Sequence, residues 1–398
     1  MMKRNRSSNV RITPNVNKKP AGKGTGKAAK KHGFDSRQLP WAIAAVVAVI
    51  IVIVLVLVLA PGKSDKKNTT TKAGSSVTTT KKGSKTPTTT DDVDTTAVTQ
   101  AQDYSMQGSV LVIGTSAMEV YYVSESSLTN YGNVISSFAA KVPDSSVYVC
   151  LAPSSIEFNG PQSYHEGAHS QAKGISIAYS ACTGANVKTV DARGEIAKHT
   201  AEYLYFRTDH HWTDRGAYYA YKAFCKASSQ KASDIKKLKT APSVQGYLGT
   251  MYGYSGGAQV LKDKPDYIEI FYPAGYDGAS GQIFSDASMQ NGRNFSIINT
   301  SGTSYAAIFI SGDQPLEKIT TANTSGRSIA VVKNSFGDAF IPYLIDNYTT
   351  IYVIDPRSVT FSLADFVKAN GVNDVLFLTN LMAPSISSYM KPLTTMLS

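Results

Sequence analysis

An unbroken apolar run over residues 41–60 limits what this chain can fold into more than any other feature. It begins at Trp41, ends at Ala60 and contains no charged and no polar side chain. At a rise of 1.5 Å per residue, a helix over this run spans about 30 Å, the hydrocarbon thickness of a bilayer. A buried core helix is rarely this long without a polar residue, and a cleaved signal peptide has a shorter apolar region nearer the start of the chain. We therefore expect one transmembrane helix over 41–60, with Trp41 as an interfacial anchor.

Charge divides the chain on either side of this run. Residues 1–40 carry eleven Lys and Arg against one acid, Asp35. An excess of positive charge before a span favours keeping that side in the cytoplasm. We expect 1–40 to be a disordered basic cytoplasmic tail, because it lacks the large apolar side chains of a core. Residues 61–105 contain three threonine triplets separated by Lys, Gly and Ser, which predicts a flexible linker to an extracellular domain at the cell membrane.

Residues 106–398 remain as one outer domain with nearly balanced charge. Positions 101–398 carry 22 basic and 24 acidic residues, so the net charge of +11 belongs to the tail and the linker. This balance argues against nucleic acid as a partner of the domain. Cys150, Cys182 and Cys225 lie among apolar neighbours and allow at most one disulfide, so we expect buried thiols rather than a disulfide-built scaffold.

The outer domain alternates β-rich runs with helical patterns. This alternation predicts an α/β fold with a mostly parallel sheet and helices on both faces. Strands are predicted over 110–113, 147–151, 186–190, 203–206, 329–332, 351–354 and 375–378, and helices over 131–142 and 217–224. The stretch from about 243 to 326 breaks the rhythm. It is rich in Gly, Tyr and Ser, with strand-like runs at 267–272 and 305–310, and we interpret it as a β-rich insertion.

The densest cluster of reactive side chains is Arg-Thr-Asp-His-His-Trp at 207–212, between a predicted strand and a predicted helix. Ligands bind in α/β sheets at this carboxyl edge of the strands. Residues two apart in an extended segment project to the same side, so Asp209 can orient His211 and leave its other ring nitrogen as a base. The alternative is a polar strand-to-helix turn with Trp212 in the core.

Two serines at strand ends are candidate nucleophiles for this base. Ser335 follows a β run and precedes an apolar helix that is predicted to continue through Leu344, so backbone amides at the helix start could hold an oxyanion. Ser116 has a similar setting after the predicted strand 110–113. Either serine could instead be an ordinary helix N-cap.

His165 and His169 are four residues apart on a predicted helix, a spacing that could place two nitrogens on one metal ion. No third or fourth ligand is evident nearby, so we interpret them as two exposed histidines. We predict no metal and no cofactor, and no Gly-rich phosphate loop is present.

The segment Thr-Asp-His-His-Trp-Thr at 208–213, followed by Gly-Ala-Tyr-Tyr-Ala-Tyr at 216–221, resembles the DHHW-motif family of bacterial surface proteins. Further blocks follow in the expected order at 112–114 with 118–119, 152–157, 312–315, 333–337 and 354–357. That family is similar to the SGNH-like domains of alginate O-acetyltransferases, which carry an Asp-x-His-Trp motif and a later serine. The resemblance implies an SGNH-hydrolase-like three-layer domain, with Asp209 and His211 as the dyad and Ser335 as the nucleophile. It disfavours Ser116, which precedes the dyad.

The resemblance also implies a function. The leading hypothesis is cell-surface acyl transfer, namely O-acetylation of a cell-wall or secreted polysaccharide, with a membrane-bound O-acyltransferase as the partner that supplies the acetyl donor. Arg357, Trp212 and Tyr252 are the candidate substrate-binding residues, and Tyr247 and Tyr254 could also present rings to a sugar. The alternatives are a carbohydrate O-acetylesterase with the same triad, which shares the acyl-enzyme step, and a non-catalytic cell-wall-binding or assembly protein.

Overall fold

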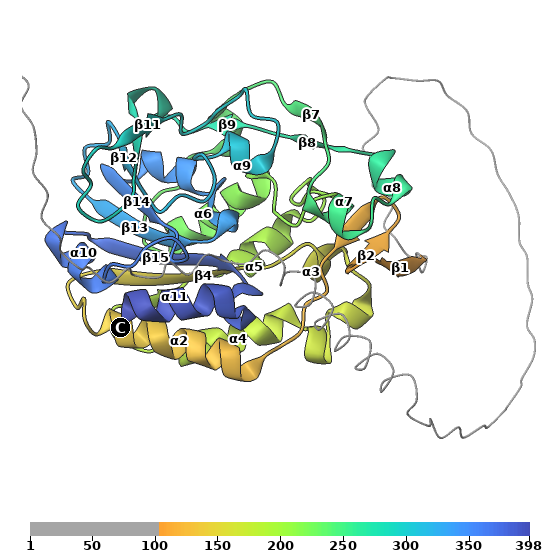
Figure 1. Ribbon diagram of the computed structural model, residues 1–398, viewed down its shortest axis with the longest axis horizontal. Coiled ribbons are helices and arrows are strands. Elements are labelled where there is room, and N and C mark those ends of the chain that lie inside the picture. Colours follow the sequence, from red (N-terminus) through yellow and green to blue (C-terminus); the bar gives the residue numbers. More distant parts are fainter. Residues whose placement is uncertain (1–102) are drawn as a thin grey trace, which may run out of the picture. The chain divides into compact units, whose positions relative to one another are not determined.

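An eight-stranded sheet forms the centre of the domain in the computed structural model, which describes residues 103–398 (Figure 1). The strand order is β11-β10-β12-β14-β13-β15-β4-β5. In that order the strands are Arg293–Phe295, Ser280–Phe284, Leu316–Thr320, Thr350–Ile354, Ser328–Lys333, Asp374–Asn380, Ser146–Ala152 and Val187–Thr189. The five strands from β14 to β5 are parallel, whereas β11, β10 and β12 join the sheet by antiparallel pairs. The sheet is therefore mixed, and the prediction of a mostly parallel sheet holds only for the β14-to-β5 side.

Helices cover both faces of this sheet, as Figure 1 shows. Alternate side chains of β4 point to opposite faces, so that Val147 and Val149 join one hydrophobic cluster while Tyr148 and Cys150 join the other. One face packs against α2 (Glu125–Ala139), α4 (Gln171–Ala181), α10 (Leu363–Ala369) and α11 (Ser387–Leu397), and the other against α5 (Ala192–Ile196) and α6 (Asp214–Ala227). The result is an α/β domain with a buried central sheet.

Three strand predictions need correction: one strand belongs to a different sheet, and two segments do not form regular strands. Residues 110–113 do form a strand, β2, but it belongs to a separate antiparallel sheet with β1 (Tyr104–Gln107) and β3 (Ser116–Met118). Residues 203–206 form only an isolated bridge from Tyr205 to Trp212. Residues 305–310 begin with a short helix, α9 (Tyr305–Ile308), because the Ser304 side chain caps its first turn by accepting the Ala307 N–H.

The interval 243–326 contains one short strand pair, one strand of a second pair and three strands of the main sheet. β7 (Val244–Tyr247) pairs with β8 (Asp266–Ile268), and β9 (Phe271–Tyr272) pairs with β6 (Lys239–Thr240), which precedes the interval. Two short helices follow β7, namely α7 (Thr250–Tyr254) and α8 (Gln259–Lys262). β10, β11 and β12 also lie in this interval, so it extends the central sheet.

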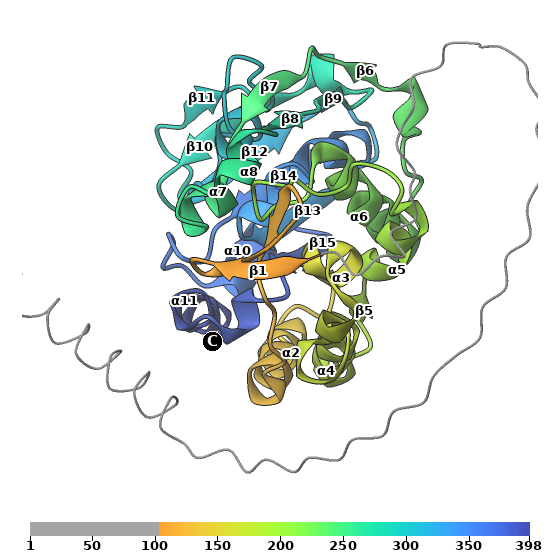
Figure 2. The same cartoon turned by 90° about the vertical axis from the view of Figure 1, so that its right-hand side faces the viewer.

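The small β1–β3 sheet lies across one end of the domain, beside α7 and α3 (Ile156–Asn159) (Figure 2). Apolar side chains on its two faces pack against Met251 of α7 and Ile156 of α3. The turn between β1 and β2 is tied to α7, because Ser109 donates its backbone N–H to the Tyr254 carbonyl at 3.1 Å. Gly108 in that turn has a positive φ of 57°, and a Cβ there would lie 2.0 Å from the Tyr254 carbonyl oxygen. This turn therefore needs glycine for both its conformation and its close contact.

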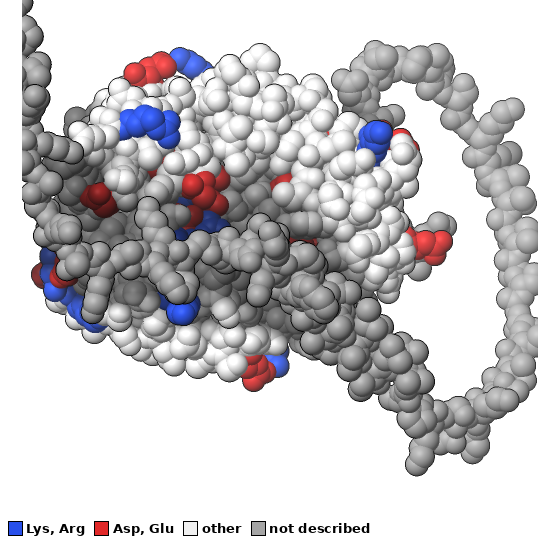
Figure 3. Space-filling model, in the orientation of Figure 1, with Lys and Arg blue, Asp and Glu red and all other residues white. Residues whose placement is uncertain are grey.

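The predicted tail, the predicted transmembrane helix and the predicted linker up to residue 102 lie outside the described residues, whereas the last two linker residues, Tyr104 and Ser105, belong to β1. Within 103–398, no helix is long and apolar enough to cross a membrane. All three cysteines are free thiols, as predicted; Cys150 and Cys225 are buried and Cys182 is half-buried. On the face of the molecule shown in Figure 3, the visible surface of the domain is mostly uncharged, with acidic and basic side chains in small mixed groups. This distribution fits the balanced charge of the domain.

Candidate active site

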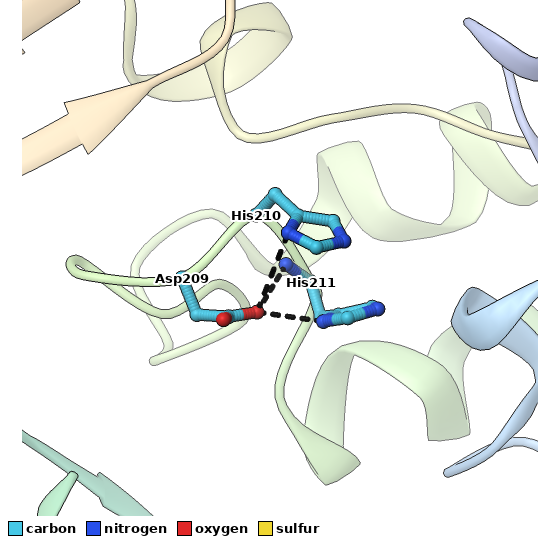
Figure 4. A group of neighbouring side chains, drawn as sticks. All are labelled: Asp209, His210 and His211. Carbon is cyan, nitrogen blue, oxygen red and sulfur yellow. Dashed lines mark hydrogen bonds and ion pairs between the residues drawn. The ribbon is translucent and has the colours of Figure 1, made fainter. Parts of the chain in front are cut away.

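Three side chains from two distant parts of the sequence meet near the carboxyl edge of the parallel strands. The Ser335 hydroxyl lies 2.8 Å from His211 Nε2, and His211 Nδ1 lies 2.6 Å from Asp209 Oδ1. Figure 4 shows the contact between the Asp209 carboxylate and the His211 ring. A carboxylate on Nδ1 keeps the proton there, so that Nε2 accepts the hydrogen bond donated by the Ser335 hydroxyl. The geometry is that of a serine nucleophile with an oriented general base.

Asp209 is buried and held by five hydrogen bonds. Its Oδ1 also accepts the His211 backbone N–H at 3.0 Å. Its Oδ2 accepts the Tyr247 hydroxyl at 2.9 Å, the Thr250 backbone N–H at 2.8 Å and the Thr250 hydroxyl at 3.2 Å. Burial alone would raise the pKa of Asp209, but the hydrogen bond and charge of His211, the nearby His210 and the Thr250 amide hold that pKa well below its ordinary value. Asp209 is therefore ionised at neutral pH.

The tight fit around Asp209 depends on a glycine. A Cβ on Gly249 would lie 2.2 Å from the Asp209 Cβ, so only glycine leaves room for the carboxylate next to the start of α7. Tyr247, which we predicted to face a sugar, is buried and donates to Asp209. The sequence gave no sign of this role, because Tyr247 is 38 residues from Asp209 and the two meet only through the tertiary fold.

Buried aromatic rings connect the dyad to the turn that carries Ser335. The His211 ring stacks on Tyr305, with ring centroids 4.2 Å apart and an interplanar angle of 11°. The Tyr305 hydroxyl in turn accepts the Ala339 N–H at 3.2 Å. Trp212 is fully buried and donates its indole N–H to the Phe336 carbonyl at 2.9 Å. This burial does not fit the predicted substrate contact of Trp212; instead, its ring joins the two halves of the site.

His210 lies against the dyad but is not part of the hydrogen-bonded chain. Its ring centroid is 3.9 Å from that of His211, and its Nδ1 is hydrogen bonded to the Thr250 hydroxyl at 2.6 Å. Burial and the neighbouring His211 lower the pKa of His210, despite the opposing effect of Asp209. His210 is therefore neutral at neutral pH and adds no positive charge beside the base.

Ser335 begins a 3₁₀ turn, η7 (Ser335–Gly337), directly after β13. The predicted helix through Leu344 consists instead of this turn and a second 3₁₀ segment, η8 (Ile341–Asp346), which has Pro342 in its first turn. The Asn334 side chain caps η7 by accepting the Phe336 N–H. The Ser335 backbone N–H has no hydrogen-bond partner within residues 103–398, so it is free to donate to an oxyanion.

The neighbouring strand end supports this turn through an asparagine that the sequence did not single out. Asn380 ends β15, and its side-chain oxygen accepts the Asn334 amide at 3.1 Å and the Ala383 N–H at 3.1 Å. Asn380 thus links the residue before Ser335 to the adjacent parallel strand.

A buried charge network lies under the nucleophile turn. Lys333, two residues before Ser335, is fully buried, and its Nζ donates to Asp338 and, at 2.7 Å, to Asp313. Burial alone would lower the pKa of Lys333, but the surrounding carboxylates raise it above its ordinary value. Lys333 therefore stays charged and fixes the end of β13 to its neighbours.

Arg357, predicted to bind substrate, belongs to the outer edge of this network. Its guanidinium donates to Asp313 at 2.6 Å and to Asp355 at 2.7 Å. The pKa of Arg357 is raised, chiefly by its hydrogen bond to Asp355. Both contacts are with carboxylates of the domain itself, so its positive charge is already balanced.

The remaining candidate residues lie apart from the hydrogen-bonded chain. Ser116 is on β3 and lines a separate cavity of about 200 Å³. Tyr252, predicted to contact substrate, is half-buried against the cluster beneath the β1–β3 sheet. His165 and His169 are half-buried, and each ring is hydrogen bonded to a backbone carbonyl, at 3.0 Å and 2.8 Å respectively.

Among the described residues, Asp209, His210 and His211 also offer metal-ligand atoms within 4.8 Å of one another. Both His211 nitrogens and both Asp209 oxygens already take part in the hydrogen bonds described above. A structural zinc site requires four ligands. The donor set therefore fits a proton-transfer site better than a metal site.

Comparisons with solved structures support the fold. A DHHW family protein from Eubacterium siraeum is 29% identical, with a TM-score of 0.67, over 74% of this chain and 98% of that one. Bacillus cereus PatB1, also solved with a sulfonyl adduct, is 18% identical, with a TM-score of 0.56, over 72% of this chain and 99% of that one. The O-acetyltransferase domain of Pseudomonas putida AlgJ is 14% identical over 69% of this chain and 88% of that one, but its TM-score of 0.38 is too low to carry an inference.

Sequence comparison identifies the family. No curated protein shows a significant match. The family model described as "DHHW protein" matches residues 56–354, which include the dyad, its aromatic neighbours and Ser335. The chain therefore belongs to the DHHW protein family.

Proposed function

We propose that the domain catalyses acyl transfer, with O-acetylation of a cell-wall or secreted polysaccharide as its reaction. The observation that carries this proposal is the continuous hydrogen-bonded chain from Asp209 through His211 to Ser335. It supplies a nucleophile, a base and the group that orients the base, each already in hydrogen-bond contact.

In the first step the Ser335 Oγ attacks the carbonyl carbon of an acetyl donor while His211 Nε2 takes the hydroxyl proton. The tetrahedral intermediate collapses as the leaving group departs with that proton, and an acetyl-serine ester remains. In the second step a sugar hydroxyl attacks the ester and gives its proton to His211 Nε2. The C–O bond to Ser335 then breaks, and the proton returns to the serine oxygen. Asp209 stabilises the positive charge that His211 carries in both steps.

Two features of the site support this sequence. The Ser335 backbone N–H, which has no partner among residues 103–398, is a candidate donor to the oxyanion. Trp212, next to His211, and Lys333, two residues before Ser335, are buried and hydrogen bonded to neighbouring segments. They hold the reacting groups in place before substrate binds, which lowers the reorganisation energy of the reaction.

The location and the donor supply extend this proposal. If residues 41–60 span the membrane with the basic tail inside, the domain faces the cell surface, where acetyl groups must be brought across the bilayer. We therefore include a membrane-bound O-acyltransferase as the partner that delivers the donor. The same triad would catalyse ester hydrolysis if water replaced the sugar hydroxyl, so acceptor use decides between transferase and esterase.

The test is mass spectrometry of the purified full-length chain after incubation with an activated acetyl ester such as p-nitrophenyl acetate. An acetylated serine adds about 42 Da. We expect this adduct in the wild type and in Ser116→Ala, and its loss in Ser335→Ala. A sulfonyl fluoride gives a second readout, because it sulfonylates activated serine hydroxyls with loss of fluoride and the sulfonylated serine can be mapped by peptide digestion.

An adduct that disappears in Ser116→Ala and persists in Ser335→Ala would overturn the assignment of the nucleophile. The absence of any adduct and of any ester turnover in wild-type protein would favour the non-catalytic cell-wall-binding or assembly protein.

A further inference from the structure

A cavity of about 530 Å³ lies between the β1–β3 sheet, α7 and the segment after β15. This volume is in the range of small-molecule sites, about 300–1,000 Å³. Three tyrosine rings contribute to its lining, from Tyr122, Tyr164 and Tyr254. Tyr122 and Tyr254 are 64% and 49% exposed, so their rings are available to a ligand.

Short segments connect this cavity to both halves of the catalytic chain. Helix α7 begins at Thr250, which donates to Asp209, and ends at Tyr254, which lines the cavity. At 1.5 Å per residue these two positions are about 6 Å apart along the helix. On the other side, Met382 lines the cavity two residues after Asn380, which holds the residue next to Ser335. The cavity therefore lies beside the triad.

Among the described residues that line the cavity, Glu119 is the only acidic one. Burial raises the pKa of Glu119, with His210 opposing the rise, which places the carboxyl within electrostatic range of the dyad. Within residues 103–398 it has no ion-pair or hydrogen-bond partner. Its oxygens are therefore available to accept hydrogen bonds from ligand hydroxyls.

The described residues that line the cavity include no lysine and no arginine. Arg357 and Lys333 are bound to carboxylates of the domain, and Arg207, two residues before Asp209, is paired with Asp266. A polysaccharide of uronic acids would bring one carboxylate per sugar into a site that offers an unpartnered acid and no free cation. Desolvating those charges without partners is unfavourable.

Resting on the function proposed above, we propose that this cavity is the acceptor site and that it binds an uncharged glycan, whose sugar rings stack on Tyr122 and Tyr254 and whose hydroxyls bond to Glu119. Tyrosine combines an apolar ring face with a polar hydroxyl, which suits the alternating apolar and polar surfaces of a sugar. None of the three triad side chains lines the cavity, so a glycan bound here would extend from it toward His211, the base that must take the proton of the acceptor hydroxyl.

The experiment measures binding by isothermal titration calorimetry with the full-length chain purified in detergent. The probes are a neutral N-acetylglucosamine tetramer and an oligouronate of the same length. We expect the neutral tetramer to bind and the oligouronate to bind at least tenfold more weakly. Tyr122→Ala and Tyr254→Ala should each weaken binding of the neutral tetramer by about tenfold, because each removes one stacking ring.

Two further variants sharpen the test. Tyr272→Ala is the matched control, because Tyr272 is a half-buried tyrosine of β9 that lines a different cavity; it should leave tetramer binding unchanged. Glu119→Gln should retain the neutral tetramer and improve oligouronate binding, since the acid is removed while its shape is kept.

The inference is overturned if neither glycan binds, if the oligouronate binds as tightly as the neutral tetramer, or if Tyr272→Ala weakens binding as much as the cavity variants. These outcomes are distinct from failure of the catalytic proposal, because acetylation of Ser335 by a small activated ester is read by mass spectrometry without any glycan present.

Discussion

Replacing Asp209 by asparagine tests the catalytic chain with the least change in shape. Each carboxylate oxygen of Asp209 faces one backbone N–H, that of His211 on Oδ1 and that of Thr250 on Oδ2. Hydroxyl donors can rotate to accept a hydrogen bond instead, but a backbone N–H cannot. In either orientation the asparagine NH₂ group therefore meets a backbone donor that it cannot satisfy.

The two orientations have different consequences for catalysis. With the NH₂ group toward His211, the imidazole must carry its proton on Nε2, and it can no longer accept the Ser335 proton. A wrong tautomer of this kind lowers catalysis by about 10⁴-fold in a serine triad, which corresponds to about 5.5 kcal/mol in the barrier. With the NH₂ group toward Thr250, the tautomer is kept but the charge that stabilises the imidazolium is lost. Both orientations predict a large loss of acylation rate.

The assay is the burst of p-nitrophenol released from p-nitrophenyl acetate, compared between wild type, Asp209→Asn and Asp263→Asn. Asp263 is an exposed aspartate after α8 whose side chain bonds only to Gln259 among the described residues, so its variant should match the wild type. An Asp209→Asn variant that keeps more than about one tenth of the wild-type burst rate would contradict the proposed role of Asp209, because the expected loss is about 10⁴-fold.

Three further predictions concern stability, measured by urea denaturation. Tyr247→Phe should lower the free energy of unfolding by about 1.5 kcal/mol, since it removes a hydrogen bond to the buried Asp209 charge; Tyr267→Phe, whose hydroxyl has no partner in the described part of the chain, should change it little. Lys333→Met should lower the free energy of unfolding by about 3–5 kcal/mol, because it leaves the buried Asp338 carboxylate without its cation. Burial raises the pKa of Asp214 to about 8, so the folded state keeps a proton that the unfolded chain releases near pH 4, and stability should fall as pH rises between about 4 and 8. Asp214→Asn should flatten this fall, and an unchanged slope would contradict the assignment.

The dyad was predictable from the sequence because its geometry is local. Asp209 and His211 are two residues apart, so their proximity follows from the chain itself. Ser335 was one of two candidate serines at predicted strand ends, and the family resemblance was needed to prefer it to Ser116. Ser335 lies in the turn after a distant strand, so its contact with His211 does not follow from sequence spacing. Tyr305 was not predicted as a site residue, because residues 305–310 were predicted to be a strand and in fact begin with a capped helical turn. Its ring contacts His211 only in the folded domain.

The sheet shows the same division between local and non-local information. The apolar runs that form β4, β13, β14 and β15 gave correct strands, because a strand buried on both faces reads as a continuous apolar run. In the 243–326 interval, the strand-like run at 267–272 indicated β structure, but the strands β10 and β12 were not predicted. β10 pairs with β12, and β12 pairs with β14, through contacts between residues far apart in the sequence.

The short loop that carries Asp209, His211 and Trp212 is closed by its own backbone. Phe206 donates to the His211 carbonyl, and Thr213 donates to the Leu204 carbonyl. A loop that is closed by hydrogen bonds at its base keeps its internal geometry whatever the length of the chain on either side. Surface segments elsewhere can therefore lengthen or shorten without altering the dyad, whereas one residue inserted between 206 and 213 would misalign acid, base and anchor together.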